Sequence, residues 1–561
     1  LSFFICLTFK DYLKPIETGL LQQVIEGANA IELRIDLLQD FTNVQRVRDQ
    51  ISMLRRITDM PLIFTIRTCA QGGKFPTDTQ DQWALLLRLM KMAIRLCLAF
   101  IDVEVCWPTT IKRVLFERAG HPTKLIISDH CYQNQYFAHE YYDLFTTCFS
   151  AGRADVVKVV TRASSFHDVS KLRQAYQRFV EEHPNIPTIA LATTDQGKLS
   201  RVLNRVLTPV THAQLPSAAA PGQMSIAQIS KTRHLLAATA CLSEPIDALP
   251  TYLKPYQTKL FLFGKNISAS PSPAMHTAGF LSLGLEDRLH YAIADEYDNG
   301  EQVIDAIRKD QSLIGGNVTV PFKEQVVPVV DHLSDAAKAI QSVNTLIAVD
   351  SIGDQPRQVY GFNTDWIGIA KPIAQCLCGT KLSDSALITK LSDSALIIGA
   401  GGTARAAAYA LIQLKQSGVY GSLKRVEIFN RSADKAQKLI DHFNQLSTQL
   451  HSNILFQMVK TLQDIKPSVI ITTVPPQAQN AQAVQHLSAS NVINKDVVAC
   501  FFEVLYKPTP SPYVAYVESI LPSDRIIDGK KMLLEQGLPA FSIWTGFTAP
   551  KISMSNVFHD V

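Results

Sequence analysis

Eight short runs rich in β-branched, aromatic and aliphatic residues recur through the first 212 residues of this 561-residue chain, with helical stretches between them. The runs are residues 3–8, 30–36, 62–67, 99–105, 125–129, 155–160, 188–193 and 207–212. Eight strands that alternate with helices over about 200 residues are typical of a (β/α)8 barrel, whose functional groups lie at the C-terminal ends of the strands. We therefore predict an α/β fold that begins with a TIM barrel.

Polar side chains occur within or just after these apolar runs, where a barrel places its functional groups. They are Glu32, Arg34, Asp36, Arg67, Asp102, Glu104, His130 and Lys158. Each has a structural alternative, such as a salt bridge between Glu32 and Arg34. Together they predict one site at the barrel mouth.

Lys158 lies inside the apolar run Asp155–Val160, where a buried parallel strand would be expected to have only Val, Ile or Leu. A charged ammonium is costly in a dry interior, and a neutral amine there is the nucleophile needed to form a Schiff base with a ketone. The alternative is an amine that extends from the strand end to water. The polar residues on the neighbouring runs favour the Schiff base.

Composition narrows the range of partners. The formal net charge is only +4, without a block of like charges, which argues against nucleic acid and membrane surfaces and leaves small anions. The ten cysteines form no zinc-binding pattern, and no apolar run approaches the roughly 20 residues of a membrane span. We expect a cytoplasmic protein without a metal.

The chain lacks an initial Met, so we interpret residues 1–9 as a first strand and the chain as part of a longer protein.

A second α/β pattern begins at about Leu260, after a proline-containing segment at 242–258 that we interpret as a linker. Its centre, Ala395–Ala408, is a strand that continues into a G-x-G-x-x-A turn and an Ala-rich helix, the context in which backbone N–H groups bind a pyrophosphate. The candidate cofactor residues there are Gly399, Gly401, Gly402, Thr403 and Ala404. Just upstream, residues 380–388 are repeated at 389–397, which we attribute to slippage or a gene-model error.

The next predicted strand ends in Asn430, Arg431 and Ser432 instead of an acidic residue. An acidic side chain there would bind a free ribose 2′-hydroxyl, whereas a guanidinium can pair with a 2′-phosphate. The residues favour NADP(H) over NAD(H). The alternative is an arginine in an ordinary surface loop.

Several short motifs, taken in their order along the chain, resemble those of two enzyme families. ELRIDL, FTIRT, ISDH, VVKV, Leu199-Ser-Arg201, PVTH and APGQ resemble type I 3-dehydroquinate dehydratases. Ser270-Pro-Ser272-Pro, Asn317–Lys323, SVNT, NTD, GAGGTA, YKP and MLLEQG resemble shikimate dehydrogenases. In this order the chain resembles the C-terminal portion of the pentafunctional AROM polypeptide.

The resemblance implies roles for individual residues. In the barrel, Lys158 would attack the ketone of 3-dehydroquinate and His130 would act as base, with Asp102 or Glu104 orienting it. In the second half, Lys323 and Asp365 would form the catalytic pair that serves reduction of 3-dehydroshikimate by NADPH. The implied substrate-binding residues are Glu32, Arg34, Arg67, Arg201, Gln223, Ser270, Ser272, Thr319, Asn344 and Gln536.

The implied domains are a dehydratase barrel at 1–241, the linker, a substrate-binding domain at 259–365 completed by 525–561, and a Rossmann domain at 366–524.

Gln71, Cys131 and Phe362 depart from the residues usual in these families. A ligand-sensing protein like the quinate-pathway repressors and a degraded pseudoenzyme are the alternative functions. Oligomeric state, with a homodimer as one alternative, and use of quinate stay open.

Overall fold

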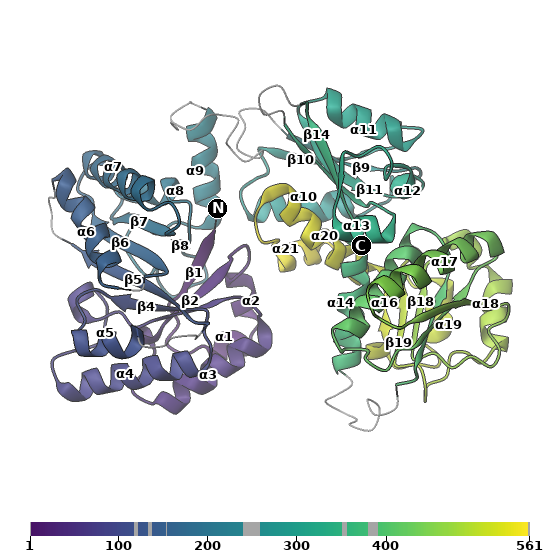
Figure 1. Ribbon diagram of the computed structural model, residues 1–561, viewed down its shortest axis with the longest axis horizontal. Helices are drawn as coiled ribbons and strands as arrows, with labels where there is room; N and C mark the ends of the chain where they lie inside the picture. The colour runs from purple at the N-terminus through teal and green to yellow at the C-terminus, as the bar shows by residue number, and fades with distance from the viewer. Residues whose placement is uncertain are drawn as a thin grey trace.

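Three β-sheets organise the chain in the computed structural model (Figure 1). The structure describes residues 2–116, 122–132, 137–152, 154–238, 258–350, 356–379 and 391–558. The predicted linker lies outside the described residues except for residue 258, and the first copy of the nonapeptide, 380–388, lies wholly outside them. No helix of the described part is long and apolar enough to cross a membrane.

The first domain is the predicted barrel, a parallel sheet in the order β7-β6-β5-β4-β3-β2-β1-β8 with helices around it (Figure 1). Its strands are β1 Phe3–Leu7, β2 Ala30–Arg34, β3 Leu62–Thr65, β4 Phe100–Glu104, β5 Lys124–Cys131, β6 Val156–Arg162, β7 Thr188–Thr193 and β8 Thr208–Val210. Its helices are α1 Leu13–Glu17, α2 Leu20–Val24, α3 Val44–Ile57, α4 Gln80–Arg95, α5 Thr109–Phe116, α6 Ala138–Ser150, α7 Phe166–Glu182, α8 Lys198–Leu203 and α9 Ile226–Ala238. All eight predicted strands are present, which confirms the TIM-like fold.

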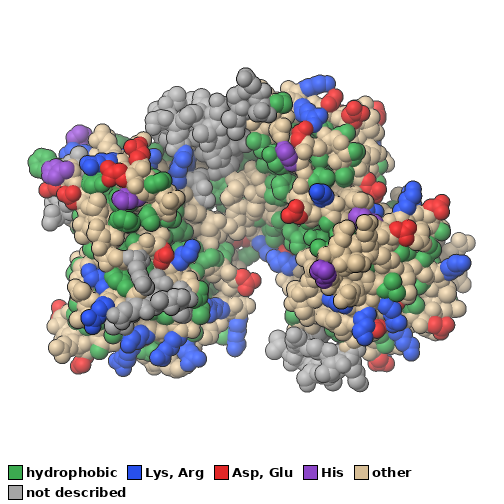
Figure 2. Space-filling model, viewed as in Figure 1, with side chains coloured by type: hydrophobic (Ala, Val, Ile, Leu, Met, Phe, Trp, Pro, Cys, Tyr) green, Lys and Arg blue, Asp and Glu red, His purple; other side chains and the backbone are tan. Residues whose placement is uncertain are grey.

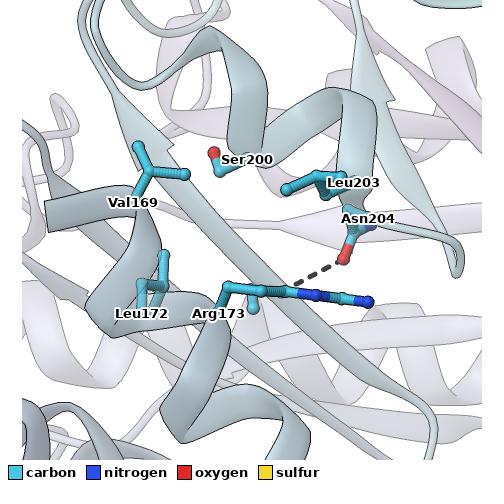
Figure 3. Close-up of a pocket in the computed structure, with 7 residues that line it drawn as sticks. Val169, Leu172, Arg173, Ser200, Leu203 and Asn204 are labelled. Atoms are coloured by element: carbon cyan, nitrogen blue, oxygen red, sulfur yellow. Dashed lines mark hydrogen bonds between the residues drawn. The ribbon is translucent and has the colours of Figure 1, made fainter. Parts of the chain in front are cut away.

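Side chains close the barrel between β7 and β8, which are the two edges of the hydrogen-bonded sheet. Asn204 Oδ1 accepts from the N–H of Ala190 at 3.2 Å, and its Nδ2 donates to Thr208 Oγ1 at 2.8 Å. Ser200 Oγ accepts from the N–H of Ala192 at 2.7 Å. Figure 3 shows Asn204 and Ser200 facing the residues of α7 across a small cavity. These contacts satisfy β7 amides that have no strand partner on that side.

The middle domain has a mixed sheet in the order β10-β9-β11-β13-β14-β12. Its elements are β9 Thr258–Phe263, α10 Ser272–Ser282, β10 Leu289–Ala294, α11 Gly300–Lys309, β11 Leu313–Val318, α12 Phe322–Gln325, β12 His332–Leu333, α13 Asp335–Ile340, β13 Thr345–Val349 and β14 Gln358–Phe362, with α20 Gly529–Thr545 and α21 Lys551–Asn556 from the C-terminal region. Figure 1 shows α20 and α21 packed between this sheet and the barrel.

The third domain has a parallel sheet in the order β17-β16-β15-β18-β19-β20. Its elements are β15 Ser394–Ile398, α16 Gly402–Gln416, β16 Arg425–Phe429, α17 Ala433–Gln449, β17 Leu455–Met458, β18 Val469–Thr472, α18 Ala481–Ala489, β19 Cys500–Glu503, α19 Pro512–Val517 and β20 Ile526–Ile527, and α14 Asp365–Gly379 leads into it. This is the 3-2-1-4-5-6 order of a Rossmann fold. The pairing of β20 with β19 places Ile526 and Ile527 in this sheet, just beyond the predicted boundary at residue 525, and the domain division stays a prediction.

The base of the barrel is packed against the middle domain. One buried apolar cluster contains Phe3 of β1, Leu283 and Phe547, and it continues through both domains. Gly284 has a φ of +69°, and a Cβ there would lie 2.8 Å from the carbonyl oxygen of Ala227, so this close approach requires glycine. On the face shown in Figure 2, the barrel and the third domain are separated, and the middle domain joins them. The C-terminal strand ends of the barrel point away from this interface.

Candidate active sites in the barrel and beside the Rossmann domain

Lys158 lies on β6, and its side chain is buried in the barrel mouth, with the residue only 4% exposed. Its Nζ is 2.9 Å from Asp102 Oδ2 and 3.5 Å from Glu32 Oε1, and it lies 5.6 Å from the centre of the Phe4 ring. The amine is therefore buried, but its surroundings are not apolar. Two carboxylates from neighbouring strands thus lie within ion-pair distance of the buried amine.

Arg67 is the centre of the carboxylate network. Its guanidinium contacts Asp102 Oδ2 at 2.9 Å, Glu104 Oε1 at 3.0 Å and Ser128 Oγ at 3.1 Å. Burial opposes ionisation of Asp102, but the positive charges of Arg67 and Lys158 outweigh it and lower the pKa of Asp102 below its usual range. Arg67 thus fixes the acidic residues in place, and its predicted contact with substrate stays a prediction.

Glu32 and Arg34 do not pair with each other. Arg34 forms a two-pronged pair with Asp36, with Nε and Nη2 at 2.9 and 2.8 Å from the carboxylate oxygens. Glu32 instead accepts from Thr65 Oγ1 at 2.9 Å and faces Lys158. Glu32 therefore belongs to the amine site, and Arg34 is held beside it by Asp36.

His130 lies within β5, whereas we expected it just after the strand. Its backbone N–H donates to Gln71 Oε1 at 2.6 Å, and Gln71 Nε2 donates to Asp129 Oδ1 at 3.2 Å. The departure at Gln71 is compatible with this arrangement because an amide can accept and donate at once. Cys131 is the last residue of β5 and is half-buried.

The imidazole of His130 is neutral in this environment. Burial and the positive charges of Arg67 and Lys158 lower its pKa well below the usual value, although Asp102 opposes them. Its Nδ1 is buried, and among the described residues it has no hydrogen-bond partner. Neither Asp102 nor Glu104 bonds to the ring, so the structure does not show the orienting contact that we left open between them. A neutral imidazole on the strand beside that of Lys158 can act as a base.

Arg201 of α8 is a buried cation that pairs with no carboxylate in the part of the chain that the structure describes. The residue is 1% exposed, and its Nε and Nη1 atoms have no hydrogen-bond partner within the described residues. Burial lowers the pKa of its guanidinium to about 10. A buried unpaired charge is costly, and a two-pronged donor fits a carboxylate. Gln223 is nearby in the mouth, where its Nε2 lies 3.2 Å from Cys6 Sγ.

Sequence reasoning missed several side chains of the mouth. Thr65 and Ser128 supply hydroxyls to Glu32 and Asp102, and their strand register places them there: Thr65 is paired with Asp102, and Ser128 with Lys158. Each lies on the face of its strand that points into the barrel. The alternation of inward and outward positions along a strand could have identified both residues. A hydroxyl on a strand is otherwise too common to predict a site.

A second cluster of polar side chains lies between the middle and Rossmann domains. Lys323 Nζ of α12 is 2.6 Å from Asp365 Oδ2 at the start of α14. Asn344 Nδ2 lies 2.8 Å from the other oxygen of Asp365 and 3.0 Å from Gln536 Oε1 on α20. The structure therefore brings together four predicted residues from four separate segments. The departure at Phe362 lies outside these contacts, at the end of β14.

Residues that we did not predict support this cluster. Thr364 Oγ1 lies 2.9 Å from Asn344 Nδ2, and Asn317 Nδ2 donates to the carbonyl of Asn344 at 3.2 Å. Tyr291 holds Asn317 through a hydrogen bond of 2.7 Å. Asn317 was part of a quoted motif, but the sequence does not show that its side chain supports Asn344.

Three predicted substrate-binding residues, Ser270, Ser272 and Thr319, lie in the middle domain. The N–H of Ser272 donates to Ser270 Oγ at 3.3 Å, so the two serines form one turn before α10. Within the described residues, no hydrogen bond links these three side chains to Lys323 or Asn344. Their contact with substrate stays a prediction.

The glycine loop after β15 has the geometry of a dinucleotide site. Gly399 has a φ of +122°, and a Cβ there would lie 2.2 Å from Thr473 Oγ1, so only glycine fits. Gly401 precedes α16, and the space where its Cβ would lie is open. A Cβ on Gly402 would be 3.6 Å from Lys323 Cβ, so the helix N-terminus lies beside the Lys323–Asp365 pair. Thr403 and Ala404 continue this first turn.

The loop after β16 contains the predicted residues of cofactor selection. Ser432 is the N-cap of α17 and accepts from the N–H of Lys435, and Asn430 Nδ2 donates to the carbonyl of Ser432 at 2.9 Å. These two residues have structural roles. Arg431 is exposed at this edge of the sheet. Its position fits a 2′-phosphate and also fits an ordinary surface loop, so preference for NADP(H) stays a prediction.

Two protein families match the chain. Residues 3–240 match the type I 3-dehydroquinase family, and residues 262–346 match the shikimate dehydrogenase substrate binding domain. The solved structure of dehydroquinate dehydratase and shikimate dehydrogenase from S. pombe AroM is 30% identical, with a TM-score of 0.75, and the match covers 99% of this chain and 98% of that one.

Two pentafunctional AROM polypeptides show how much of a longer protein the chain matches. That of Schizosaccharomyces pombe is 33% identical over 541 residues, which are 94% of this chain and 31% of the relative. That of Saccharomyces cerevisiae S288c is 33% identical over 559 residues, 98% of this chain and 32% of the relative. The chain thus spans about a third of the length of these relatives. It belongs to the AROM family, in which it corresponds to the C-terminal type I 3-dehydroquinase and shikimate dehydrogenase domains.

Proposed function

We propose that the chain converts 3-dehydroquinate to shikimate in two steps at two separate sites. The barrel dehydrates 3-dehydroquinate to 3-dehydroshikimate, and the site beside the Rossmann domain reduces this ketone. The observation that supports the first step most strongly is the combination at one mouth of a buried amine, a neutral imidazole and a buried guanidinium without an anion: Lys158, His130 and Arg201. The product of the first step is the substrate of the second, which supports both.

Dehydration begins when Lys158 Nζ, which Asp102 Oδ2 holds by a hydrogen bond, gives up a proton that ends on the oxygen of the C3 ketone and leaves with it as water. The free amine adds to the C3 ketone, and loss of water gives an iminium that draws electrons from the neighbouring C–H bond. Neutral His130 removes that proton and returns it to the departing hydroxyl. Arg201 pairs with the substrate carboxylate, and Gln223 binds ring hydroxyls. Hydrolysis of the iminium then frees the product and restores Lys158.

Reduction takes place beside the glycine loop. Bound NADPH would supply the hydride to the carbonyl carbon. Lys323 donates a hydrogen bond to the carbonyl oxygen and stabilises the negative charge that develops there. Asp365, 2.6 Å away, orients the lysine. Asn344 and Gln536 bind the ring hydroxyls on the opposite side of the same cluster.

The decisive experiment supplies 3-dehydroquinate and NADPH to the intact chain and follows NADPH consumption. We expect consumption by the unsubstituted chain, and none from 3-dehydroquinate after Lys158→Ala, which should still reduce added 3-dehydroshikimate. Borohydride with 3-dehydroquinate should trap an adduct on Lys158, found by peptide mass spectrometry. Binding of 3-dehydroquinate without turnover would contradict the proposal and favour the repressor-like alternative.

A further inference from the structure

The C-terminal segment of the reducing half is attached to the base of the barrel. Phe547 stacks on Phe3 of β1 with ring centres 5.8 Å apart, and Asn29 Nδ2 donates to Thr548 Oγ1 at 3.0 Å. Both barrel residues lie at the N-terminal ends of strands or just before them, opposite the mouth that contains Lys158. The barrel thus has a second buried face, which the dehydration chemistry does not use.

Glu26 is the charged residue at the centre of this contact. Its carboxylate accepts hydrogen bonds from the N–H groups of Ile552 and Ser553, the latter at 3.2 Å, and from Ser553 Oγ at 2.8 Å. The first amides of a helix have no partner within the helix, so Glu26 satisfies two such donors of α21 from another domain. Hydrogen bonds to a charged acceptor are stronger than those between neutral groups. Glu26 therefore fixes the start of α21.

α21 is connected in turn to the reductase site. Lys551, its first residue, pairs with Glu535 of α20, and Lys371 of α14 lies 2.9 Å from the other oxygen of the same carboxylate. The side chain of Glu535 is only 6% exposed, whereas those of Lys371 and Lys551 are 51% and 47% exposed, so one buried carboxylate connects two lysines from different helices. The next residue of α20 is Gln536, whose amide oxygen contacts Asn344 and Thr364. A continuous set of contacts thus runs from the barrel base to the predicted substrate pocket.

We propose that Glu26 is a positioning residue for the reductase, supplied by the dehydratase barrel. By holding α21, it sets the Lys551–Glu535 pair and with it the position of Gln536 against Asn344. This inference rests on the proposed reductase function. It differs from a purely structural cap, which would stabilise the chain without changing how the reductase binds its substrate.

The test compares Glu26→Ala, Glu26→Gln and Ser553→Ala in the full chain, with Glu17→Gln, an exposed glutamate on α1, as the matched control. The same samples are assayed for 3-dehydroshikimate reduction and 3-dehydroquinate dehydration, and α20 and α21 are followed by hydrogen exchange. Loss of hydrogen bonds to a charged group should raise amide exchange in α21 and the KM for 3-dehydroshikimate about tenfold in Glu26→Ala. The kcat and dehydration should change less than about twofold.

Glu26→Gln keeps the acceptor without the charge, so its KM should lie between those of Glu26→Ala and the unsubstituted chain. Faster exchange in α21 with an unchanged KM would overturn the inference and leave only a structural cap. An equal loss of dehydration would show general destabilisation and overturn it too. If the unsubstituted chain does not reduce 3-dehydroshikimate, the proposed function is wrong, and the positioning role is then tested by hydrogen exchange alone. Unchanged amide exchange around Gln536 in Glu26→Ala would overturn the positioning role.

Discussion

Replacing Arg201 with methionine should stabilise the barrel and lower its dehydratase activity. A pKa of about 10 in place of 12.5 means that burial costs the charged guanidinium about 3 kcal/mol, at 1.36 kcal/mol for each pH unit. Because the charged form is disfavoured in the folded state, this cost applies at all pH values below about 10 and falls as pH rises through that value. Methionine is similar in length and uncharged, so we expect a gain of about 1 to 3 kcal/mol, or roughly 2 to 12 °C in Tm for a domain of this size.

The same substitution removes the partner of the substrate carboxylate. Loss of a buried charged contact should lower kcat/KM for 3-dehydroquinate about 100- to 1000-fold. The assay combines the thermal loss of dehydratase activity, which reports the unfolding of the barrel, with initial rates at varied substrate. Arg48→Met, on the exposed side of α3, is the control and should change neither quantity. A less stable barrel with an unchanged kcat/KM would refute the inference that this guanidinium binds the substrate carboxylate.

Two further predictions concern the base and the cofactor. Because burial and neighbouring cations lower the pKa of His130, the base should stay neutral well below pH 6.5, so kcat/KM for dehydration should hold through pH 6 and fall only as pH drops through that lowered pKa. A fall centred near 6.5 in the pH–rate profile would contradict the assigned environment. Arg431→Ala should raise the KM for NADPH about tenfold and leave the KM for NADH unchanged, both measured with 3-dehydroshikimate as substrate. Equal effects on the two cofactors would show that Arg431 is an ordinary surface residue.

Local patterns explain why so much of the fold could be predicted. Each barrel strand is an apolar run with its own flanking turn, so its existence does not depend on which strand lies next to it. The glycine loop was identifiable because Gly399 must adopt a backbone conformation and a close approach that other residues do not tolerate. The motifs likewise supplied Lys323, Asp365, Asn344 and Gln536, and the structure brings these four together.

Partner choice inside the sites could not be predicted. Arg34 pairs with Asp36 instead of Glu32, and Arg67 binds two carboxylates, because the register of β2, β3 and β4 decides which side chains meet. Lys158 is buried, but Glu32 and Asp102 contact it from other strands. These pairings depend on distances between segments that lie far apart in the chain.

The sequence by itself determined the strands, the glycine loop and the residue types at each site, because propensity, periodicity and backbone strain act over a few neighbouring residues. Only the tertiary structure decided that Asn204 closes the barrel, that β20 joins the Rossmann sheet and that Glu26 holds α21 more than 500 residues away. Such contacts form between surfaces that exist only after each domain has folded. Their energies therefore leave no pattern along the chain.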